Sequence, residues 1–206
     1  MKTSAGLTLI ELMVTLAVLA IVAAIAVPNL HSFTRNNRLT AQINDFVTAL
    51  QVTRSEAVRR GAHVVLCASS NQTQCNTTQW EQGWIVFLDG SNDFATASPA
   101  GRPAAAKNDV VLQVGSALSG NDTLRSSFTN TGAIMYLSTG ATSAGNSSGT
   151  FTLCDPGDPS DSSNLLHRRK RARAVNVGST GFISQATDTD ASGIVNDITG
   201  TDVTCP

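Results

Sequence analysis

Apolar side chains are distributed in three different ways along the chain. Residues 7–27 form an almost unbroken apolar run, in which Thr8, Glu11 and Thr15 are the polar positions. From residue 39 to residue 58 the apolar positions recur at helical spacing, and beyond residue 62 they form short β-branched or aromatic runs. The pattern predicts a long helix with an apolar and an amphipathic half, followed by a β-rich domain.

The apolar run is long enough to cross a bilayer. At about 1.5 Å per residue, Leu7–Val27 reaches roughly 30 Å, the thickness of a hydrocarbon core. Lys2 and the N-terminal amine are the positive groups ahead of it, so the front is expected in the cytoplasm and the rest outside. Glu11 is unusual in this run because a carboxylate that leaves water needs a cation or hydrogen-bond donors.

The segment Gly6-Leu7-Thr8-Leu9-Ile10-Glu11-Leu12-Met13-Val14 resembles the processing motif of type IV pilins and type II secretion pseudopilins. The resemblance implies cleavage between Gly6 and Leu7 by a prepilin peptidase and N-methylation at Leu7. It also implies that Glu11 pairs with the amine of a neighbouring subunit in the fibre, and that Pro28 kinks the helix. Leu7 departs from the phenylalanine that is usual after the cut.

Two simpler interpretations compete for the same segment. One is a secretory signal peptide with Ala24-Ile25-Ala26 as its cleavage site. The other is a membrane anchor without a role in assembly. Neither of them provides a partner for Glu11.

The second half of the helix is amphipathic. Arg59 and Arg60 suit the negative end of a helix, and Gly61 suits the position just after it. We expect one helix from about Leu7 to Arg60, roughly 80 Å long. The apolar positions of its second half are Leu39, Ile43, Phe46, Val47, Leu50, Ala57 and Val58.

Short apolar runs bounded by Gly, Asn, Asp and Ser predict strands in the rest of the chain. No helix-length pattern separates them, so antiparallel pairing is expected. The predicted strands are Ala62–Ala68, Trp84–Leu88, Val110–Val114, Leu124–Phe128, Ala133–Leu137, Thr150–Cys154, Ala172–Val177 and Phe182–Gln185. The segments 91–107, 140–149 and 155–164 are predicted to be loops.

Composition supports an exported domain. Charged residues make up 14% of the chain, below the usual quarter, and the net charge of −1 argues against a general electrostatic partner. The four cysteines permit three pairings, and export would favour their oxidation. We favour Cys67–Cys75, which closes a short polar loop, and Cys154–Cys205, which fixes the C-terminal segment. Zinc is the alternative, but the chain has no Cys-x-x-Cys.

A second resemblance covers the β-rich region. Cys67 and Cys75, followed by Trp80-Glu81-Gln82-Gly83-Trp84-Ile85-Val86-Phe87-Leu88-Asp89, are similar to the FimT/GspH group of minor pilins and pseudopilins. Phe151–Asp155, Arg171–Val175 and Gly181 match the C-terminal pattern of that group. The resemblance implies an α+β pilin fold, in which a long N-terminal helix packs on an antiparallel, β-sandwich-like head. The two tryptophans are interpreted as core residues.

The expected division of the chain follows from these patterns. Residues 1–6 form the prepilin leader and residues 7–28 the transmembrane or fibre-core helix. Residues 29–61 form the amphipathic helix half, and residues 62–206 form the head.

The sequence shows no catalytic constellation. His31, His63 and His167 are far apart, and no nucleophile elbow, zinc-protease motif or phosphate-binding glycine loop is present. We therefore expect neither an enzyme nor a cofactor.

A basic run is the most distinctive feature of the head. Arg168, Arg169, Lys170, Arg171 and Arg173 are a candidate DNA-binding patch, because neutralising phosphates releases counterions. The FimT branch binds DNA through a C-terminal Gly-Arg-x-Arg, but the matching positions here read Gly181-Phe182-Ile183-Ser184. A contact with a neighbouring subunit and a solvated, charged strand edge are the alternatives.

Asp188, Asp190 and Ser192 resemble the opening of a calcium-binding loop. An EF-hand would need an acid at its twelfth position, which is Thr199. A polar turn is the simpler interpretation, so no metal is expected.

Together these features predict a minor type IV pilin that is incorporated near the pilus tip and supports assembly. The alternatives are a GspH-like minor pseudopilin of type II secretion and a DNA-binding minor pilin for natural transformation. The expected partners are other pilins, the prepilin peptidase, the inner membrane and, in the last case, DNA. Before assembly the chain would span the inner membrane with its head in the periplasm, and afterwards it would lie in the extracellular pilus.

Overall fold

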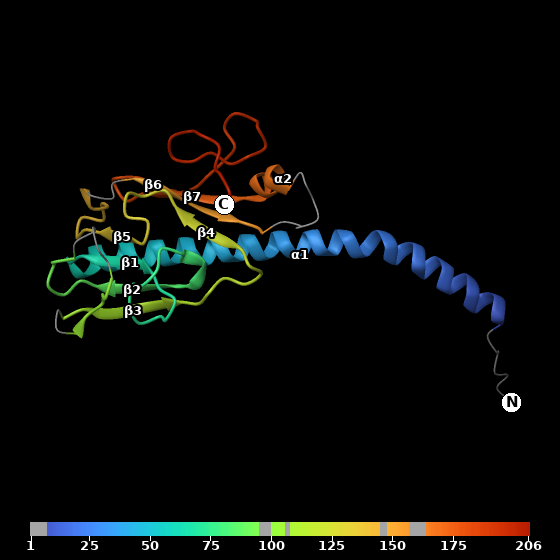
Figure 1. Ribbon diagram of the computed structural model, residues 1–206, viewed down its shortest axis with the longest axis horizontal. Helices are drawn as coiled ribbons and strands as arrows, with labels where there is room; N and C mark the ends of the chain where they lie inside the picture. Colours follow the sequence, from blue (N-terminus) through green and yellow to red (C-terminus); the bar gives the residue numbers. More distant parts are fainter. Residues whose placement is uncertain (1–7, 95–99, 106–107, 145–147, 157–163) are drawn as a thin grey trace. The chain divides into compact units, whose positions relative to one another are not determined.

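The computed structural model describes residues 8–94, 100–105, 108–144, 148–156 and 164–206 (Figure 1). These residues form the α+β fold that the sequence predicts. The helices are α1 (Leu9–Arg60), the short 3₁₀ helix η1 (Trp80–Gln82) and α2 (Asn164–Arg171). The strands are β1 (Val64–Ala68), β2 (Trp84–Leu88), β3 (Val110–Gly115), β4 (Thr123–Ser126), β5 (Ala133–Tyr136), β6 (Gly149–Cys154), β7 (Arg173–Val177) and β8 (Ile183–Gln185).

Both ends of α1 are capped. At the start, the Oγ1 atom of Thr8 accepts a hydrogen bond from the backbone N–H of Glu11 at 3.3 Å. At the end, Gly61 has φ +63°, its N–H bonds to the carbonyl of Val58, and the N–H of Ala62 bonds to that of Ala57. This pair of bonds is a Schellman motif, which requires a residue such as glycine at positive φ. The helix begins at Leu9, whereas the predicted start, Leu7, lies outside the described residues.

Two antiparallel sheets complete the fold. One has the strand order β3-β2-β1-β5 and the other β4-β6-β7-β8. Each of the eight strands overlaps a run that the sequence predicts, although β3, β4 and β6 each extend one residue beyond the predicted bounds. All of the pairings are antiparallel, as expected.

One core joins the second half of α1 to both sheets. Phe46 of α1 lies 5.2 Å from Trp84 of β2 and 4.7 Å from Phe151 of β6, measured between ring centroids. Trp80 completes the cluster, and its indole N–H donates to the carbonyl of Thr131 at 2.6 Å. The two tryptophans are core residues, as the sequence predicts. Edge-to-face rings of this kind add to the burial of apolar area.

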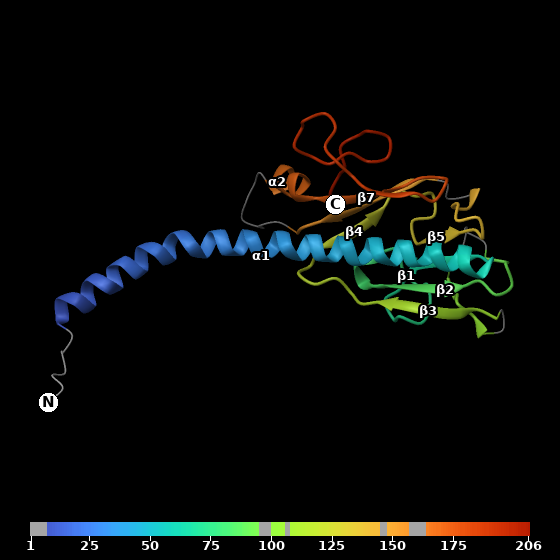
Figure 2. The same ribbon diagram turned by 180° about the vertical axis from the view of Figure 1, so that it is seen from behind.

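Each sheet also buries its other face against loops. Val65 and Cys67 of β1 pack with Cys75 and Phe94, whereas Val64 and Leu66 face the main core. Beside the second sheet, Ile194 and Val203 of the C-terminal segment pack near Ala174 of β7. Figures 1 and 2 show this segment and α2 near β7. Burial on both faces explains why β1 reads as a continuous apolar run.

Two sequence expectations differ from the structure. Helix α2 begins at the last residue of a predicted loop and includes most of the basic run, for which the sequence predicts no helix. Val58 was expected to continue the buried stripe of α1 but is 54% exposed. The preceding residue, Ala57, is fully buried and occupies the position that faces the core, so Val58 is turned about 100° away.

The chain divides into two compact units, Met1–Arg38 and Leu39–Pro206. The second unit contains the whole core described above. The helix α1 is long and apolar enough to cross a membrane, as judged from its length and composition.

Candidate functional site

The apolar part of α1 is the first candidate site, because its described side chains are exposed. Every described residue from 8 to 27 is exposed. At roughly 1.5–3 kcal/mol for each fully buried side chain, covering this surface would yield on the order of 20 kcal/mol or more. Side chains more than half exposed are Leu9, Ile10, Leu12, Met13, Val14, Leu16, Val18, Leu19, Ile21, Val22, Ile25, Val27, Leu30 and Phe33.

Glu11 lies in the first turn of this helix and is exposed. Its backbone N–H is used by Thr8, and a carboxylate near a helix N-terminus interacts favourably with the helix dipole. Thr8-x-x-Glu11 is also the sequence signature of a capping box, a signal that our sequence reasoning missed. Gly6 and Leu7, the predicted processing residues, lie outside the described residues.

The basic run forms α2 and the start of β7, and its arginines hold neighbouring segments. Arg168 donates through Nε to the carbonyl of Asp155 at 2.9 Å, and Arg171 donates to the Asp155 carboxylate at 3.0 Å. Arg169 donates to the carbonyl of Val203 at 3.0 Å and pairs with Asp202 at 3.6 Å. Two carboxylates, of Asp155 and Asp202, thus face the basic run. The run has more positive side chains than this, so its net charge stays positive.

Lys170 and Arg173 complete the predicted patch. Lys170 is exposed, and Arg173 donates to the carbonyls of Arg171 and Ala172 at 3.1 and 3.2 Å. DNA binding by this patch stays a prediction, but most of its guanidinium groups also have a structural role.

The candidate calcium residues lie in a turn that already satisfies their oxygens. Asp188 accepts the backbone N–H of Gly193 at 2.7 Å, and Asp190 accepts that of Ser192 at 3.1 Å. The hydrogen bond from the Ser192 N–H is the largest cause of the lowered pKa of Asp190. Within the described ranges, no three acidic, histidine or cysteine side chains gather as a metal site would require.

Two disulfides join the pairs that were favoured from the sequence. Cys67 of β1 is bonded to Cys75, and Cys154 at the end of β6 is bonded to Cys205. The second bond spans 51 residues and ties the C-terminal segment beside α2. On the chain-entropy account, a loop of this length stabilises the fold by about 4 kcal/mol.

A charged cluster organises the connection between β2 and β3. The guanidinium of Arg102 contacts Asp89 at 2.7 Å, Asp93 at 2.9 Å and Asp109 at 2.5 Å. The side chains of Asp89 and Asp109 are fully buried, and the hydrogen bond to Asp109 is the largest cause of the raised pKa of Arg102. Sequence reasoning missed this cluster, because nothing local connects these four residues.

Comparison with known families decides the identity of the chain. The sequence model of the family described as "Type II transport protein GspH" matches residues 42–181, which is more than half of the chain. The chain belongs to the GspH family. In this GspH-family chain, residues 1–27 also match the prokaryotic N-terminal methylation motif.

Individual relatives agree with this assignment. Two curated proteins named "Fimbrial protein" from Pseudomonas aeruginosa are 35% identical to the GspH-family chain over 91 residues, which is 44% of it and 56% of each relative. The chain thus spans little more than half the length of these relatives. The crystal structure of the type IV minor pilin FimU from Pseudomonas aeruginosa superposes with a TM-score of 0.52. It covers 75% of this chain and 92% of FimU at 17% identity, so it supports the fold alone.

These findings establish the GspH family for the chain and a FimU-like fold for its structure. The methylation motif matches the same end of the chain as the part of α1 that is long and apolar enough to cross a membrane.

Proposed function

We propose that the chain is a minor subunit of a type IV pilus that primes or supports fibre assembly near the tip. It would be cut between Gly6 and Leu7, methylated at Leu7 and held in the inner membrane by residues 7–28 with its head in the periplasm. It would then enter the fibre by helix packing. The observation that carries the proposal is the apolar half of α1, whose large apolar side chains are more than half exposed among the described residues.

Glu11 would specify the register of assembly. Its carboxylate sits among exposed apolar side chains such as Ile10 and Leu12, which other helices would cover in a fibre. Once these are covered, an unpaired charge would be costly, and the N-terminal amine of an adjacent subunit is the nearest cation that assembly supplies. This pairing supports addition of the subunit at one depth only.

The test replaces Glu11 by Ala in cells that make pili. We expect incorporation of the subunit into sheared pili to fall about tenfold or more, because the partner amine loses its carboxylate. Glu56→Ala is the matched control, since Glu56 lies on α1 outside the apolar segment and forms ion pairs with Arg59 and Arg60 of the same helix. Unchanged incorporation of the Glu11 variant would contradict the pairing.

The second candidate function is that of a minor pseudopilin in type II secretion. The match to a family described as a type II transport protein favours it, and the physics of the helix is the same. Deleting the gene separates the two functions: loss of surface pili supports the pilus role, and loss of a secreted enzyme with normal pili supports the pseudopilin role.

A further inference from the structure

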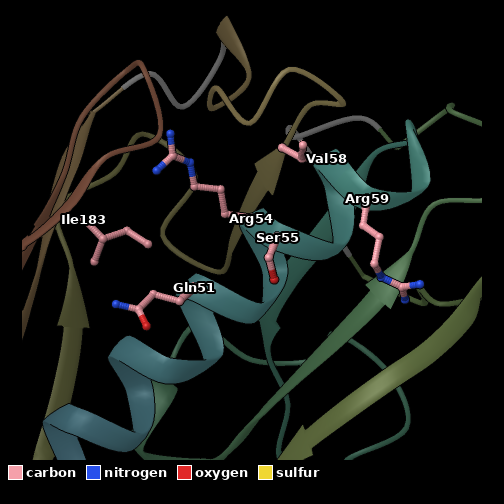
Figure 3. A pocket seen from close by; sticks show the side chains of 6 residues that line it. All are labelled: Gln51, Arg54, Ser55, Val58, Arg59 and Ile183. Carbon is pink, nitrogen blue, oxygen red and sulfur yellow. The ribbon is translucent and has the colours of Figure 1, made fainter.

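A groove runs between the last turns of α1 and the edge strand β8. Figure 3 shows Gln51 and Arg54 pointing from the helix toward the side on which Ile183 lies, while the Arg59 side chain points away from Ile183. The groove has a volume of ≈ 520 Å³, and neither the pilin assignment nor the core packing gives it a role. We call it the α1–β8 groove; its lining residues are Gln51, Arg54, Ser55, Val58, Arg59 and Ile183.

Among the residues that the structure describes, no further strand pairs with β8 on the side away from β7. β8 pairs with β7 and ends its sheet. The carbonyl of Phe182 accepts from Gly178, and the N–H of Ala186 donates to Ala174, so Phe182, Ser184 and Ala186 are the positions bonded to β7. Because antiparallel bonding alternates, the backbone groups of Ile183 and Gln185 point away from β7. They offer donors and acceptors to one further strand.

The walls of the groove have a defined chemistry. Ile183 packs partly on the main core, and Val58 is 54% exposed, so the walls are partly apolar. Arg54 donates to the carbonyls of Gly140 at 3.1 Å and Thr180 at 3.4 Å, and no carboxylate of the described chain is paired with it in a salt bridge. Its positive charge is therefore held at a fixed place without a counter-charge, whereas Arg59 is paired with Glu56 at 2.6 Å.

The size of the groove fits a short extended segment. From Gln51 to Val58 the helix rises roughly 10 Å, which is the length of about three residues of a β-strand. Outside the lining of the groove, the side-chain amide of Gln185 donates to Asn44 at 3.0 Å and joins β8 to an earlier turn of α1.

We propose that the α1–β8 groove receives an extended, acidic segment from the head of a neighbouring subunit, which adds a strand to β8. Backbone hydrogen bonds to Ile183 and Gln185 would supply affinity, and a carboxylate beside Arg54 would supply specificity. A polypeptide fits the groove better than DNA. The groove offers one fixed cation, a partly apolar wall and a strand edge, and an acidic strand can use all three. DNA binding instead requires many cations. The identity of the partner as a pilin subunit rests on the proposed function.

The first experiment measures peptide binding to the full chain in detergent micelles. The probe is fluorescein-labelled Thr-Val-Asp-Val-Thr with blocked ends, at concentrations up to about 1 mM. Two further peptides carry Asn in place of Asp, or Pro in place of the second Val. We expect the Asp peptide to bind, and the Asn and Pro peptides to bind at least about fivefold more weakly, since they lose the charge or the pairing ability.

Variants of the protein locate the site. Gln51 is exposed on α1, so Gln51→Glu and Gln51→Lys change the charge of the groove without disturbing the core. We expect Gln51→Glu to weaken the Asp peptide about threefold or more and Gln51→Lys to strengthen it by a similar factor. Ser116→Glu, at an exposed position in a separate pocket, is the matched control and should change nothing.

The outcomes are decisive in either direction. Equal binding of the three peptides, or no binding of any of them, overturns the proposal. Salt-sensitive binding of a DNA duplex also overturns it, if Gln51→Glu abolishes the binding of the duplex. In pilus-producing cells, a photo-crosslinker at Ser55 should link to an extended acidic segment in another subunit's head, and a link to a helix instead would contradict it. Since the peptide experiment needs no pilus, its failure is distinguishable from failure of the Glu11 experiment.

Discussion

Arg102 shows how one side chain can determine the structure of a whole connection. Three carboxylates contact its guanidinium, and two of them, Asp89 and Asp109, are fully buried. Asp89 and Asp109 also accept backbone N–H groups, from Phe94 at 2.9 Å and from Ala104 at 2.8 Å. Removing the guanidinium would leave two buried negative charges close together. The stability lost in this way is larger than the net stability that the intact ion pairs contribute.

We expect Arg102→Leu to lower the free energy of unfolding by about 3–5 kcal/mol. Arg102→Lys should recover only part of this, because an ammonium cannot bind several carboxylates in the planar geometry of a guanidinium. Denaturant unfolding of the purified unit Leu39–Pro206 measures both. Adding Asp109→Asn to Arg102→Leu should restore some stability, and a further loss would show that the charge of Asp109 is not the problem.

Asp197 provides a pH-dependent contribution at the C-terminal turn. Burial raises its pKa, but the Thr199 hydroxyl and the N–H groups of Thr201, Thr199 and Gly200 lower it more, so the net pKa lies below its usual value. The Thr199 hydroxyl donates at 2.6 Å and the two threonine N–H groups at 2.8 and 3.0 Å. The charged form is thus favoured by folding.

The sign of the effect follows directly. A lowered pKa stabilises the fold above the ordinary aspartate pKa of about 3.9, and this contribution is lost as the pH falls through the folded-state value. We expect Asp197→Asn to cost about 1 kcal/mol at pH 7 and much less at pH 3. Unfolding curves at the two pH values check this, and an equal cost at both would show that the charge plays no part.

Residue-scale features differ in how far the sequence predicts them. Glu11 stands out because it is an acid in an apolar run, and the capping role of Thr8 was also readable from the spacing of three residues. The partners of Arg102 lie 7 to 13 residues away along the chain, so only the folded connection brings them together.

At the scale of elements, α2 fastens the C-terminal segment. Arg169 reaches Val203 and Asp202 in that segment, while Arg168 and Arg171 reach Asp155 at the end of β6. The Cys154–Cys205 bond joins the same two regions. The structure therefore gives most of the basic run a role that is independent of any nucleic acid.

This arrangement permits a sharp test of the DNA-binding prediction. Lys170 is exposed, so Lys170→Gln should leave the free energy of unfolding unchanged. If the patch binds a duplex, the same substitution should reduce the slope of log affinity against log salt concentration by about 1, the value of one phosphate contact. Arg169→Gln should instead increase hydrogen exchange in residues 194–205, because it releases Val203. Gel shifts at two salt concentrations and exchange measurements compare the variants. Equal exchange in both would contradict the fastening role.

The strands were predictable and α2 was not, for a physical reason. Strands such as β1 and β2 are apolar and β-branched runs, and their burial determines their sequence. In α2 four of the eight residues are arginine or lysine, and tertiary contacts to carbonyls and carboxylates replace an apolar stripe. Periodicity of apolar residues, the signal on which the prediction relied, is therefore weak there.

On the scale of the molecule, the two units differ in how much of their apolar surface they bury. The unit Leu39–Pro206 buries its own core, from Leu39 and Phe46 on the helix to Phe151 and Val175 in the second sheet. The unit Met1–Arg38 exposes nearly all of its apolar side chains within the described residues. The first property suits an independent head, and the second suits a segment that is completed by lipid or by other helices.

We therefore expect residues 39–206 to fold without the preceding segment. The isolated unit should be a soluble monomer that unfolds in one cooperative transition, whereas the full chain should need detergent. Light scattering after gel filtration and thermal unfolding measure these properties. A truncated unit that is unfolded, or that aggregates while its disulfides are intact, would contradict the division.

A final consequence concerns how this surface can diversify. Gly181 has φ +77°, and a Cβ there would lie 1.8 Å from the carbonyl oxygen of Gly140 and 3.2 Å from Nε of Arg54. Any side chain at that position would force apart the two loops that Arg54 holds together. Ile183 and Ser184, two and three residues further on, are not enclosed in this way, so mutation can change what the strand recognises while the junction beneath it stays the same. Descendants of such a chain can acquire new ligands at β8 without rebuilding the head.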